Sequence, residues 1–303
     1  MLAASWLRYA RKVLLYVVIG LITAAVIYLQ LFPRATLWAQ ELMLSPAERA
    51  ASIGLGDYRI IGKPHKLSGL EAFETSGLSY SASSNTLFTV TGKTAFLIEL
   101  SLGGDVLRQI PINGVSNLEA VEVLSGGRIA VVDERMHRMS VFQVDEHTQS
   151  LDASTAENYD LGFADAGNKG FEGLAWDPEQ QRLLLAKERD PLGIFSFQLP
   201  AEANTAVTLQ ELVSGGLFVR DISSLSYDSR TGNILVLSDE SRMLVELDAQ
   251  GYPLGFINLG VGMGGFSLGI KQPEGVAIAT DGTIYVIAEP DLMYVFRKEV
   301  EPN

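Results

Sequence analysis

The sequence predicts an all-β fold, a five-bladed β-propeller that follows an N-terminal transmembrane helix. One short motif recurs five times: a polar residue, a small residue and then alternating apolar positions, with the polar residue at 76, 119, 172, 223 and 274. Successive copies are therefore 43, 53, 51 and 51 residues apart, and the intervals contain strand-like runs separated by turn residues. A repeat of this length built from strands is typical of propeller blades.

The composition supports a packed domain and excludes several classes of function. Of the 303 residues, 47% are hydrophobic and 19% are charged, which is typical of a chain that can bury a core. The net charge of −13 argues against nucleic-acid binding, since that function needs a basic surface. The chain has no cysteine, so disulfides, thiol catalysis and thiolate metal sites are excluded.

The N-terminal segment predicts a membrane anchor. Residues 13–32 contain no charged side chain, and twenty residues of helix are long enough to cross the ~30 Å hydrocarbon core of a bilayer. Arg8, Arg11 and Lys12 precede this segment and only Arg34 follows it closely, so the positive-inside rule places residues 1–12 in the cytoplasm. A cleaved signal peptide is the alternative, but its apolar core is normally shorter, about 7–15 residues.

Residues 33–56 are expected to form a juxtamembrane linker with a short helix. Ser45, Pro46 and Glu48 have the order of a capping box with proline at the first helical position, which predicts a helix over 45–53. The simplest interpretation of this linker is a stalk without a function of its own.

Residues 57–303 are predicted to form the propeller. The fifth unit begins at 272 and has only three strands, whereas residues 58–61 form a strand that belongs to no unit. We expect this N-terminal strand to complete the last blade, because closing the ring removes free sheet edges. A six-bladed ring with one degenerate unit and an open β-sandwich are the alternatives. The four complete units are 74–112, 117–162, 170–213 and 221–260.

Acidic residues gather at two equivalent positions of the repeat. The start of the first strand and the end of the second lie on the same face of a blade, because the two strands are antiparallel neighbours. The two positions therefore predict two rings of polar residues around one mouth of the channel. The inner ring is Ser76, Glu119, Glu172, Ser223 and Glu274, and the second ring is Gly92, Glu134, Glu188, Asp239 and Glu289.

Converging carboxylates suggest a cation. Glu119, Glu172 and Glu274 would repel one another in a partly dehydrated channel unless a cation, basic partners or raised pKa values offset the repulsion. Hard divalent ions prefer oxygen ligands, so we expect these three residues to bind Ca²⁺, with Mg²⁺ as the alternative. Residues in surrounding positions would be Ser76, Ser223 and Glu289. The competing interpretation is that the acids cap strands or pair with nearby Arg and Lys side chains.

The motifs also resemble a known family. The strand heads NLEAVEV, KGFEGLAWD and QPEGVAIA, with the strand ends VVDER, LAKERDP and VLSDES, look like those of the SdiA-regulated (YjiK-like) proteins of Gram-negative bacteria, over residues 57–297. That family is related to NHL-type propellers and more loosely to phytase-like and lactonase-like ones, many of which hold Ca²⁺ in the channel. The resemblance implies a single-pass protein of the bacterial inner membrane, with its N-terminus in the cytoplasm and its propeller in the periplasm. By analogy it supports Glu119, Glu172 and Glu274 as ligands.

Three functions follow as hypotheses. The favoured one is a binding module that holds a divalent cation and, through it, a small ligand or protein partner at the channel mouth. The second is a Ca²⁺-dependent hydrolase of phosphoesters or lactones, in which Glu134, Glu188 or Asp239 would act as general base. The scattered histidines weaken this enzyme hypothesis. The third is an interaction scaffold without a metal.

Overall fold

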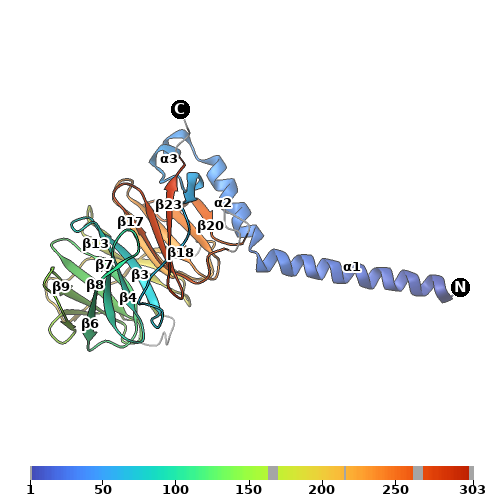
Figure 1. Cartoon of the computed structure of the whole chain (residues 1–303). Coiled ribbons are helices and arrows are strands. Elements are labelled where there is room, and N and C mark those ends of the chain that lie inside the picture. The colour runs from blue at the N-terminus through green and yellow to red at the C-terminus, as the bar shows by residue number, and fades with distance from the viewer. Residues whose placement is uncertain (1, 163–169, 215, 262–268, 300–303) are drawn as a thin grey trace.

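The structure, a computed structural model, describes residues 2–162, 170–214, 216–261 and 269–299 (Figure 1). Its strands form five antiparallel sheets arranged around an axis, so the prediction of a five-bladed propeller is confirmed. The innermost strands of the five sheets are β3, β7, β12, β17 and β21, and each contacts the innermost strand of the next blade. This closed ring of inner strands lines the central channel.

Each blade has four strands that run outward from the channel. Blade 1 consists of β3 (Thr75–Ser81), β4 (Thr86–Thr91), β5 (Phe96–Leu100) and β6 (Val106–Asn113). Blade 2 consists of β7 (Leu118–Val123), β8 (Arg128–Asp133), β9 (Arg138–Gln143) and β11 (Glu157–Asp160). Blade 3 consists of β12 (Phe171–Asp177), β13 (Arg182–Lys187), β14 (Gly193–Phe197) and β16 (Gln210–Ser214). Blade 4 consists of β17 (Ser224–Asp228), β18 (Asn233–Ser238), β19 (Met243–Leu247) and β20 (Pro253–Asn258).

The last blade is closed by the N-terminal strand, as predicted. Blade 5 has the order β21 (Pro273–Ile278), β22 (Ile284–Ala288), β23 (Leu292–Lys298) and β1 (Tyr58–Ile60). The pairing of β1 with β23 is antiparallel and places Tyr58 opposite Lys298. A further short strand, β2 (His65–Lys66), also pairs with β23. The ring is thus held shut by backbone hydrogen bonds between segments more than 200 residues apart.

Two short strands pair with the outer edges of neighbouring blades. The connection between β9 and β11 forms β10 (Leu151–Asp152), which pairs in parallel with β6 of blade 1. The connection between β14 and β16 forms β15 (Thr205–Ala206), which pairs in parallel with β11 of blade 2. These pairings extend the sheets beyond the predicted four strands and cover exposed edges.

The hydrophobic core lies between the blades. Five clusters of buried residues fill the five seams, and each cluster combines side chains of two adjacent blades. The alternation of apolar residues along each strand explains this arrangement, because successive side chains point to opposite faces of a sheet and both faces are covered by a neighbouring blade.

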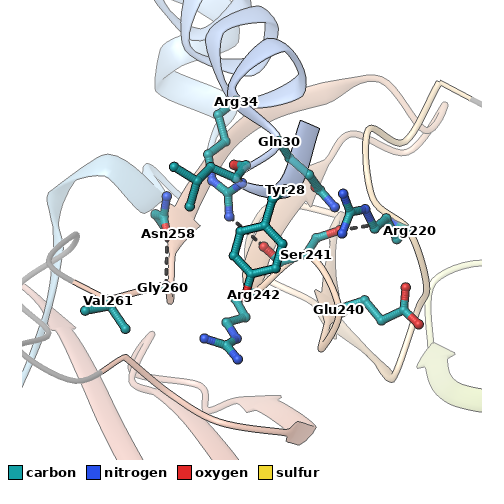
Figure 2. Close-up of a pocket in the computed structure, with 11 residues that line it drawn as sticks. Tyr28, Gln30, Arg34, Arg220, Glu240, Ser241, Arg242, Asn258, Gly260 and Val261 are labelled. Atoms are coloured by element: carbon teal, nitrogen blue, oxygen red, sulfur yellow. Dashed lines mark hydrogen bonds between the residues drawn. The ribbon is translucent and has the colours of Figure 1, made fainter. Parts of the chain in front are cut away.

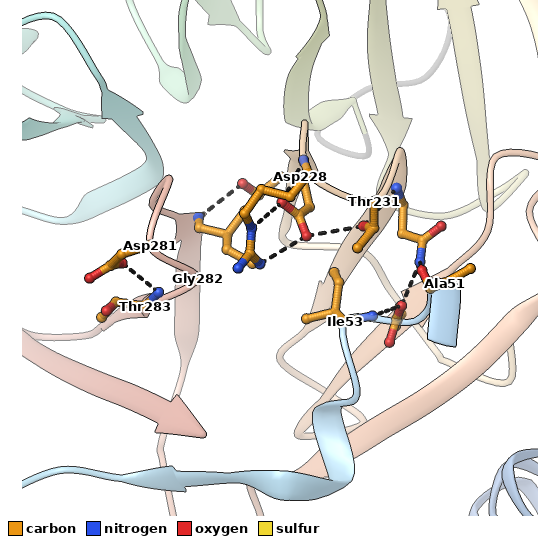
Figure 3. A network of polar contacts seen from close by, with 12 residues as sticks. Ala51, Ile53, Asp228, Thr231, Asp281, Gly282 and Thr283 are labelled. Carbon is orange, nitrogen blue, oxygen red and sulfur yellow. Dashed lines mark hydrogen bonds and ion pairs between the residues drawn. The ribbon is translucent and has the colours of Figure 1, made fainter. Parts of the chain in front are cut away.

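The segment before β1 packs against the propeller instead of forming a free stalk. It consists of α2 (Leu31–Met43), α3 (Pro46–Ala51) with the predicted capping box, and a short 3₁₀ turn, η1 (Leu55–Asp57). Leu37 of α2 is buried in the seam between blades 3 and 4, and Ile53 and Leu55 are buried between blades 4 and 5. Figure 3 shows where this segment joins the propeller: Ile53 N donates to Glu246 Oε1 over 2.6 Å, and Asn233 Nδ2 donates to the carbonyl of Ala51 over 3.0 Å.

The apolar N-terminal segment forms α1 (Leu2–Tyr28). Within it, Tyr9–Tyr28 is long and apolar enough to cross a membrane and packs against nothing else in the described structure, so it is a candidate anchor or signal sequence. The helix ends four residues before the end of the predicted 13–32 segment, and Gln30 has a left-handed backbone with φ of 50°. Pro33 explains the break, because its ring would clash with the carbonyl of Leu29 in a continuous helix.

Candidate functional site

The glutamates of the inner ring occupy β-bulges. In three blades the register between the first and second strands shifts across the glutamate: between Leu118 and Ala120, between Phe171 and Gly173, and between Pro273 and Gly275. A bulge leaves one residue out of the ladder and changes the direction of its side chain, and such irregularities are common beside functional sites. Glu119, Glu172 and Glu274 are the residues left out.

The small residue after each polar head is required by the narrow ring. A β-carbon on Gly275 would lie 2.8 Å from the backbone carbonyl carbon of Gly77 and 2.7 Å from Cγ1 of Ile287. Contacts this short do not occur, so no larger residue fits without displacement of the inner strands. The motif therefore reports the close approach of inner strands at the axis of the propeller.

The two predicted rings lie on the same face. In four blades, the second-ring residue donates its backbone N–H to the carbonyl of the residue two positions before the inner-ring head. For example, Glu134 N donates to Asn117 O over 2.9 Å, and Glu188 N donates to Gly170 O over 3.0 Å. The equivalent bonds in blades 1 and 5 are Gly92 N to Glu74 O at 3.1 Å and Glu289 N to Gln272 O at 2.9 Å.

Three carboxylates come together at the seam between blades 2 and 3. One oxygen from each of Glu134, Glu172 and Glu188 lies within 4.8 Å of the other two, so the three can contact one ion. This set takes only Glu172 from the three ligands expected from sequence, and it adds two residues that had been candidates for a general base. Glu119 and Glu274 lie outside this group but close enough for their charges to act on Glu172.

The electrostatic cost of this arrangement is visible in the pKa values. Burial, followed by the charges of Glu188 and the other inner-ring glutamates, raises the pKa of Glu172 well above its ordinary value of 4.5. Burial raises the pKa of Glu119 to about 7 and that of Glu274 to about 8. Burial also raises the pKa of Asp239 to about 6. The mouth of the channel thus holds more negative charge than its surroundings stabilise.

The three clustered glutamates differ in their partners. Glu134 accepts hydrogen bonds from Asn117 Nδ2 over 3.0 Å and from Gly170 N over 2.8 Å. Glu188 is paired with the guanidinium of Arg189. Glu172 has no hydrogen bond or ion pair within the described part of the chain. Two members of the cluster are thus oriented by the protein, and the third is left with lone pairs for a ligand.

The residues expected around the ligands have structural partners. Ser76 Oγ donates to the carbonyl of Glu119 over 3.1 Å, and Ser223 Oγ donates to the carbonyl of Pro273 over 2.8 Å. Both serines therefore join the inner strand of their own blade to that of the next. Glu289 accepts a hydrogen bond of 2.9 Å from Gln272 Nε2.

Sequence reasoning missed the polar residues two positions before the heads. Asn117 donates to both Glu119 and Glu134, over 2.8 and 3.0 Å, and so joins the two rings. Asp221, which is 3% exposed, accepts from Ser238 Oγ and from the backbone of Glu240. A signal for this row was present, because four of the five repeats carry a polar residue there. The row is Glu74, Asn117, Gly170, Asp221 and Gln272.

The donor set fits a hard divalent cation. All three clustered ligands offer carboxylate oxygens, which Ca²⁺ accepts in flexible geometry, whereas soft transition metals prefer sulfur and imidazole ligands. Arg189 competes with a cation for Glu188, but it also bonds Glu240 Oε1 over 2.7 Å and retains that partner if Glu188 turns to an ion.

Comparison with known proteins identifies a family and a fold. A family model described as SdiA-regulated matches residues 50–297, in agreement with the resemblance of the motifs. A chain in the crystal structure of a nidogen/laminin complex matches with a TM-score of 0.48 and 14% identity, covering 72% of this chain and 73% of that one. A structural-genomics protein of unknown function from Bacteroides thetaiotaomicron matches with a TM-score of 0.49 and 14% identity, covering 76% of this chain and 56% of that one. A luciferin-regenerating enzyme matches with a TM-score of 0.45 and 12% identity, covering 79% and 96%.

Proposed function

The chain belongs to the SdiA-regulated family, and we propose that it is a membrane-anchored periplasmic propeller that binds Ca²⁺ at the mouth of its channel and, through the ion, a small ligand or a protein partner. Anchoring is supported by the exposed apolar helix α1, which has basic residues only on its N-terminal side. This charge asymmetry favours a cytoplasmic N-terminus and a propeller outside the cytoplasm.

The observation that carries the cation proposal is the state of Glu172. Its carboxylate is largely buried, lacks a partner within the described residues and lies beside the carboxylates of Glu134 and Glu188. An ionised group in such a place is costly unless a counter-charge is present. A divalent cation supplies that charge and has coordination positions left, because Ca²⁺ takes 6–8 oxygen ligands. Those remaining positions are where a ligand or partner would bind.

The test is calorimetric titration of Ca²⁺ into the full chain after treatment with a chelator. Glu172→Gln, which keeps the shape and removes the charge, is expected to abolish binding. Glu119→Gln removes an inner-ring carboxylate outside the cluster and is expected to weaken binding only severalfold. Equal affinity in wild type and Glu172→Gln would refute the assignment. If Glu119→Gln and Glu172→Gln lose binding alike, the ligands are the inner-ring set predicted from sequence.

Proton release gives a second readout of the same site. The raised pKa of Glu172 means that this carboxyl carries a proton for part of the time near neutral pH, and a cation must displace it. Titrations at pH 7 in buffers with different ionisation enthalpies are expected to show proton release on Ca²⁺ binding. A release of zero would show that the ion binds away from the buried carboxylates.

A Ca²⁺-dependent hydrolase remains the alternative function, and Asp239 is the observation that favours it. Its pKa of about 6 is suited to a general base near neutral pH, and its charge acts on Glu274 at the same mouth. Assays of phosphoesters and lactones with Ca²⁺ present test this function. Hydrolysis that Asp239→Asn removes, while Ca²⁺ still binds, would establish an enzyme; no turnover of either class supports the binding module.

A further inference from the structure

The break between α1 and α2 is held by arginines from both sides. Arg220, which precedes β17, donates from Nη2 to the carbonyl of Ile27 over 2.7 Å. Arg34 of α2 donates to the carbonyl of Leu29 and, over 2.7 Å, to the carbonyl of Ser241 in the β18–β19 turn. The last carbonyls of α1 are thus capped by positive charges, and the end of the candidate anchor is fixed to blade 4.

A cavity of about 300 Å³ opens at this junction (Figure 2). Tyr28 lies within it, and Arg34, Arg220 and Arg242 are arranged around the Tyr28 ring. Glu240 also lines the cavity, but its carboxylate is paired with Arg189 over 2.7 Å. The cavity therefore has a surplus of positive charge in a protein whose net charge is −13.

Several polar groups of this cavity lack partners. Gln30 is 5% exposed, and neither its side-chain oxygen nor its side-chain nitrogen has a hydrogen-bond partner. Nε of Arg34 is also buried without a partner, and the side chain of Arg242 has no hydrogen bond within the described residues. Buried polar groups are normally paired, so this cluster of unpaired donors points to a bound acceptor.

The backbone adds to the attraction for an anion. Gln30 precedes the first turn of α2, a helix of 13 residues whose N-terminus has no side-chain cap. The free N–H groups and the positive end of the dipole at a helix N-terminus favour negative charge. Burial, followed by the charge of Arg220, lowers the pKa of Arg34, which shows that the two guanidinium groups repel each other. An anion between them would remove this repulsion.

The position of the cavity indicates the source of the anion. It lies at the end of the apolar segment Tyr9–Tyr28, where a spanning helix leaves the hydrocarbon and reaches the headgroups of a bilayer. Tyr28, Phe32 and Trp38 are each more than half exposed around the break, and aromatic rings favour this interface. A phosphodiester at this depth belongs to a membrane lipid.

We propose that the cavity formed by Gln30, Arg34, Arg220 and Arg242 binds the headgroup phosphate of an anionic phospholipid, and thereby holds blade 4 against the membrane surface. Guanidinium groups bind phosphate oxygens through paired, charge-assisted hydrogen bonds, and the amide of Gln30 offers two further donors. This inference rests on the anchoring role proposed for α1 but not on the cation at the channel mouth. It also gives the mouth a fixed relation to the membrane, because Asp239 directly precedes Glu240 and the β18–β19 turn.

The test is native mass spectrometry of the full chain in detergent with three probes: dioleoylphosphatidylglycerol, dioleoylphosphatidylcholine and inorganic phosphate. Arg242→Gln is the main variant, because the arginine side chain makes no hydrogen bond in the described structure and its removal leaves the helix caps intact. Arg34→Gln is the second variant. The matched control is Arg135→Gln, which removes an exposed arginine from the equivalent β8–β9 turn of blade 2.

Wild type and Arg135→Gln are expected to retain phosphatidylglycerol equally, and Arg242→Gln to bind it roughly tenfold more weakly, as the loss of one charge-assisted hydrogen bond predicts. Arg34→Gln should weaken it at least as much. Equal retention in all four proteins would overturn the cavity site, and so would binding of inorganic phosphate in preference to the lipid. Flotation of the full chain with vesicles separates the two proposals: if it persists while lipid binding fails, α1 is an anchor without this site, and if wild type does not float, both proposals fall.

Discussion

In the absence of divalent ions, the propeller should lose stability as the pH rises from 5 to 8. Burial raises the pKa of Glu119 from 4.5 to about 7 and that of Glu274 from 4.5 to about 8. A group whose pKa is higher in the folded state stabilises the fold fully below its unfolded pKa, and that stabilisation is lost as the pH rises toward the folded pKa. For Glu274 the loss is about 1.4 kcal/mol per pH unit above 4.5, so roughly 3 kcal/mol has gone by pH 7.

The assay is urea unfolding of the chelator-treated full chain in detergent at pH 5, 6, 7 and 8. Glu274→Gln cannot ionise, so its unfolding free energy is expected to fall less steeply with pH than that of wild type, and the two curves should diverge by roughly 2–3 kcal/mol between pH 5 and 8. Glu146→Gln is the matched control, because Glu146 is an exposed carboxylate on a loop and its replacement should leave the wild-type slope unchanged.

Saturating Ca²⁺ should flatten the wild-type curve, because the ion stabilises the ionised carboxylates in the folded state. Parallel curves for wild type and Glu274→Gln without Ca²⁺ would contradict the reasoning, since they would mean that this carboxyl titrates alike in the folded and unfolded chains. The buried ring of acids would then not be strained by its own charge.

Three further predictions concern the fold and the site. Gly275→Ala should lower the unfolding free energy by about 1–3 kcal/mol in urea denaturation because its β-carbon has no space, whereas Gly92→Ala, whose β-carbon would meet nothing nearer than 3.6 Å, should cost less than 1 kcal/mol. Leu37→Ala should cost about 2–4 kcal/mol because this side chain is 1% exposed, and Leu42→Ala, which is 59% exposed in the same helix, should cost little; similar values for the two would show that α2 does not pack on the blades. Arg189→Gln should tighten Ca²⁺ binding by roughly three- to tenfold in calorimetry by freeing the carboxylate it pairs with, and weaker binding would show instead that the arginine supports the site.

The periodicity of the sequence was sufficient to predict the architecture. Five heads at near-constant spacing require five equivalent units, and the orphan strand at 58–61 could only complete the blade that lacked one. The end of α1 was not predicted, because hydropathy continues through residue 32 while the helix stops where Pro33 forbids its continuation. The packing of α2 was also missed, since one buried leucine in a short helix gives no clear periodic signal.

The site was predicted in position but not in detail. Alignment of the repeats places both acidic rings at one mouth, because antiparallel neighbours share an edge. Repetition alone treats all blades alike, so it suggested a symmetric set from the inner ring. The structure groups Glu172 with Glu188 of its own blade and Glu134 of the blade before it, because each inner-ring glutamate is turned by a bulge. Bulges depend on local backbone packing, which the repeat pattern does not encode.

The central claim is that Glu172 binds a divalent cation, and thermal unfolding of the full chain tests it most directly. The melting temperature is measured with EDTA and then with Ca²⁺ or Mg²⁺, for wild type, Glu172→Gln and the exposed control Glu146→Gln. A cation that binds only the folded state adds about 2.7 kcal/mol at a hundredfold excess over its dissociation constant. The account predicts a Ca²⁺-dependent rise in wild type and the control that disappears in Glu172→Gln; no rise with either ion, or an equal rise in Glu172→Gln, would contradict it.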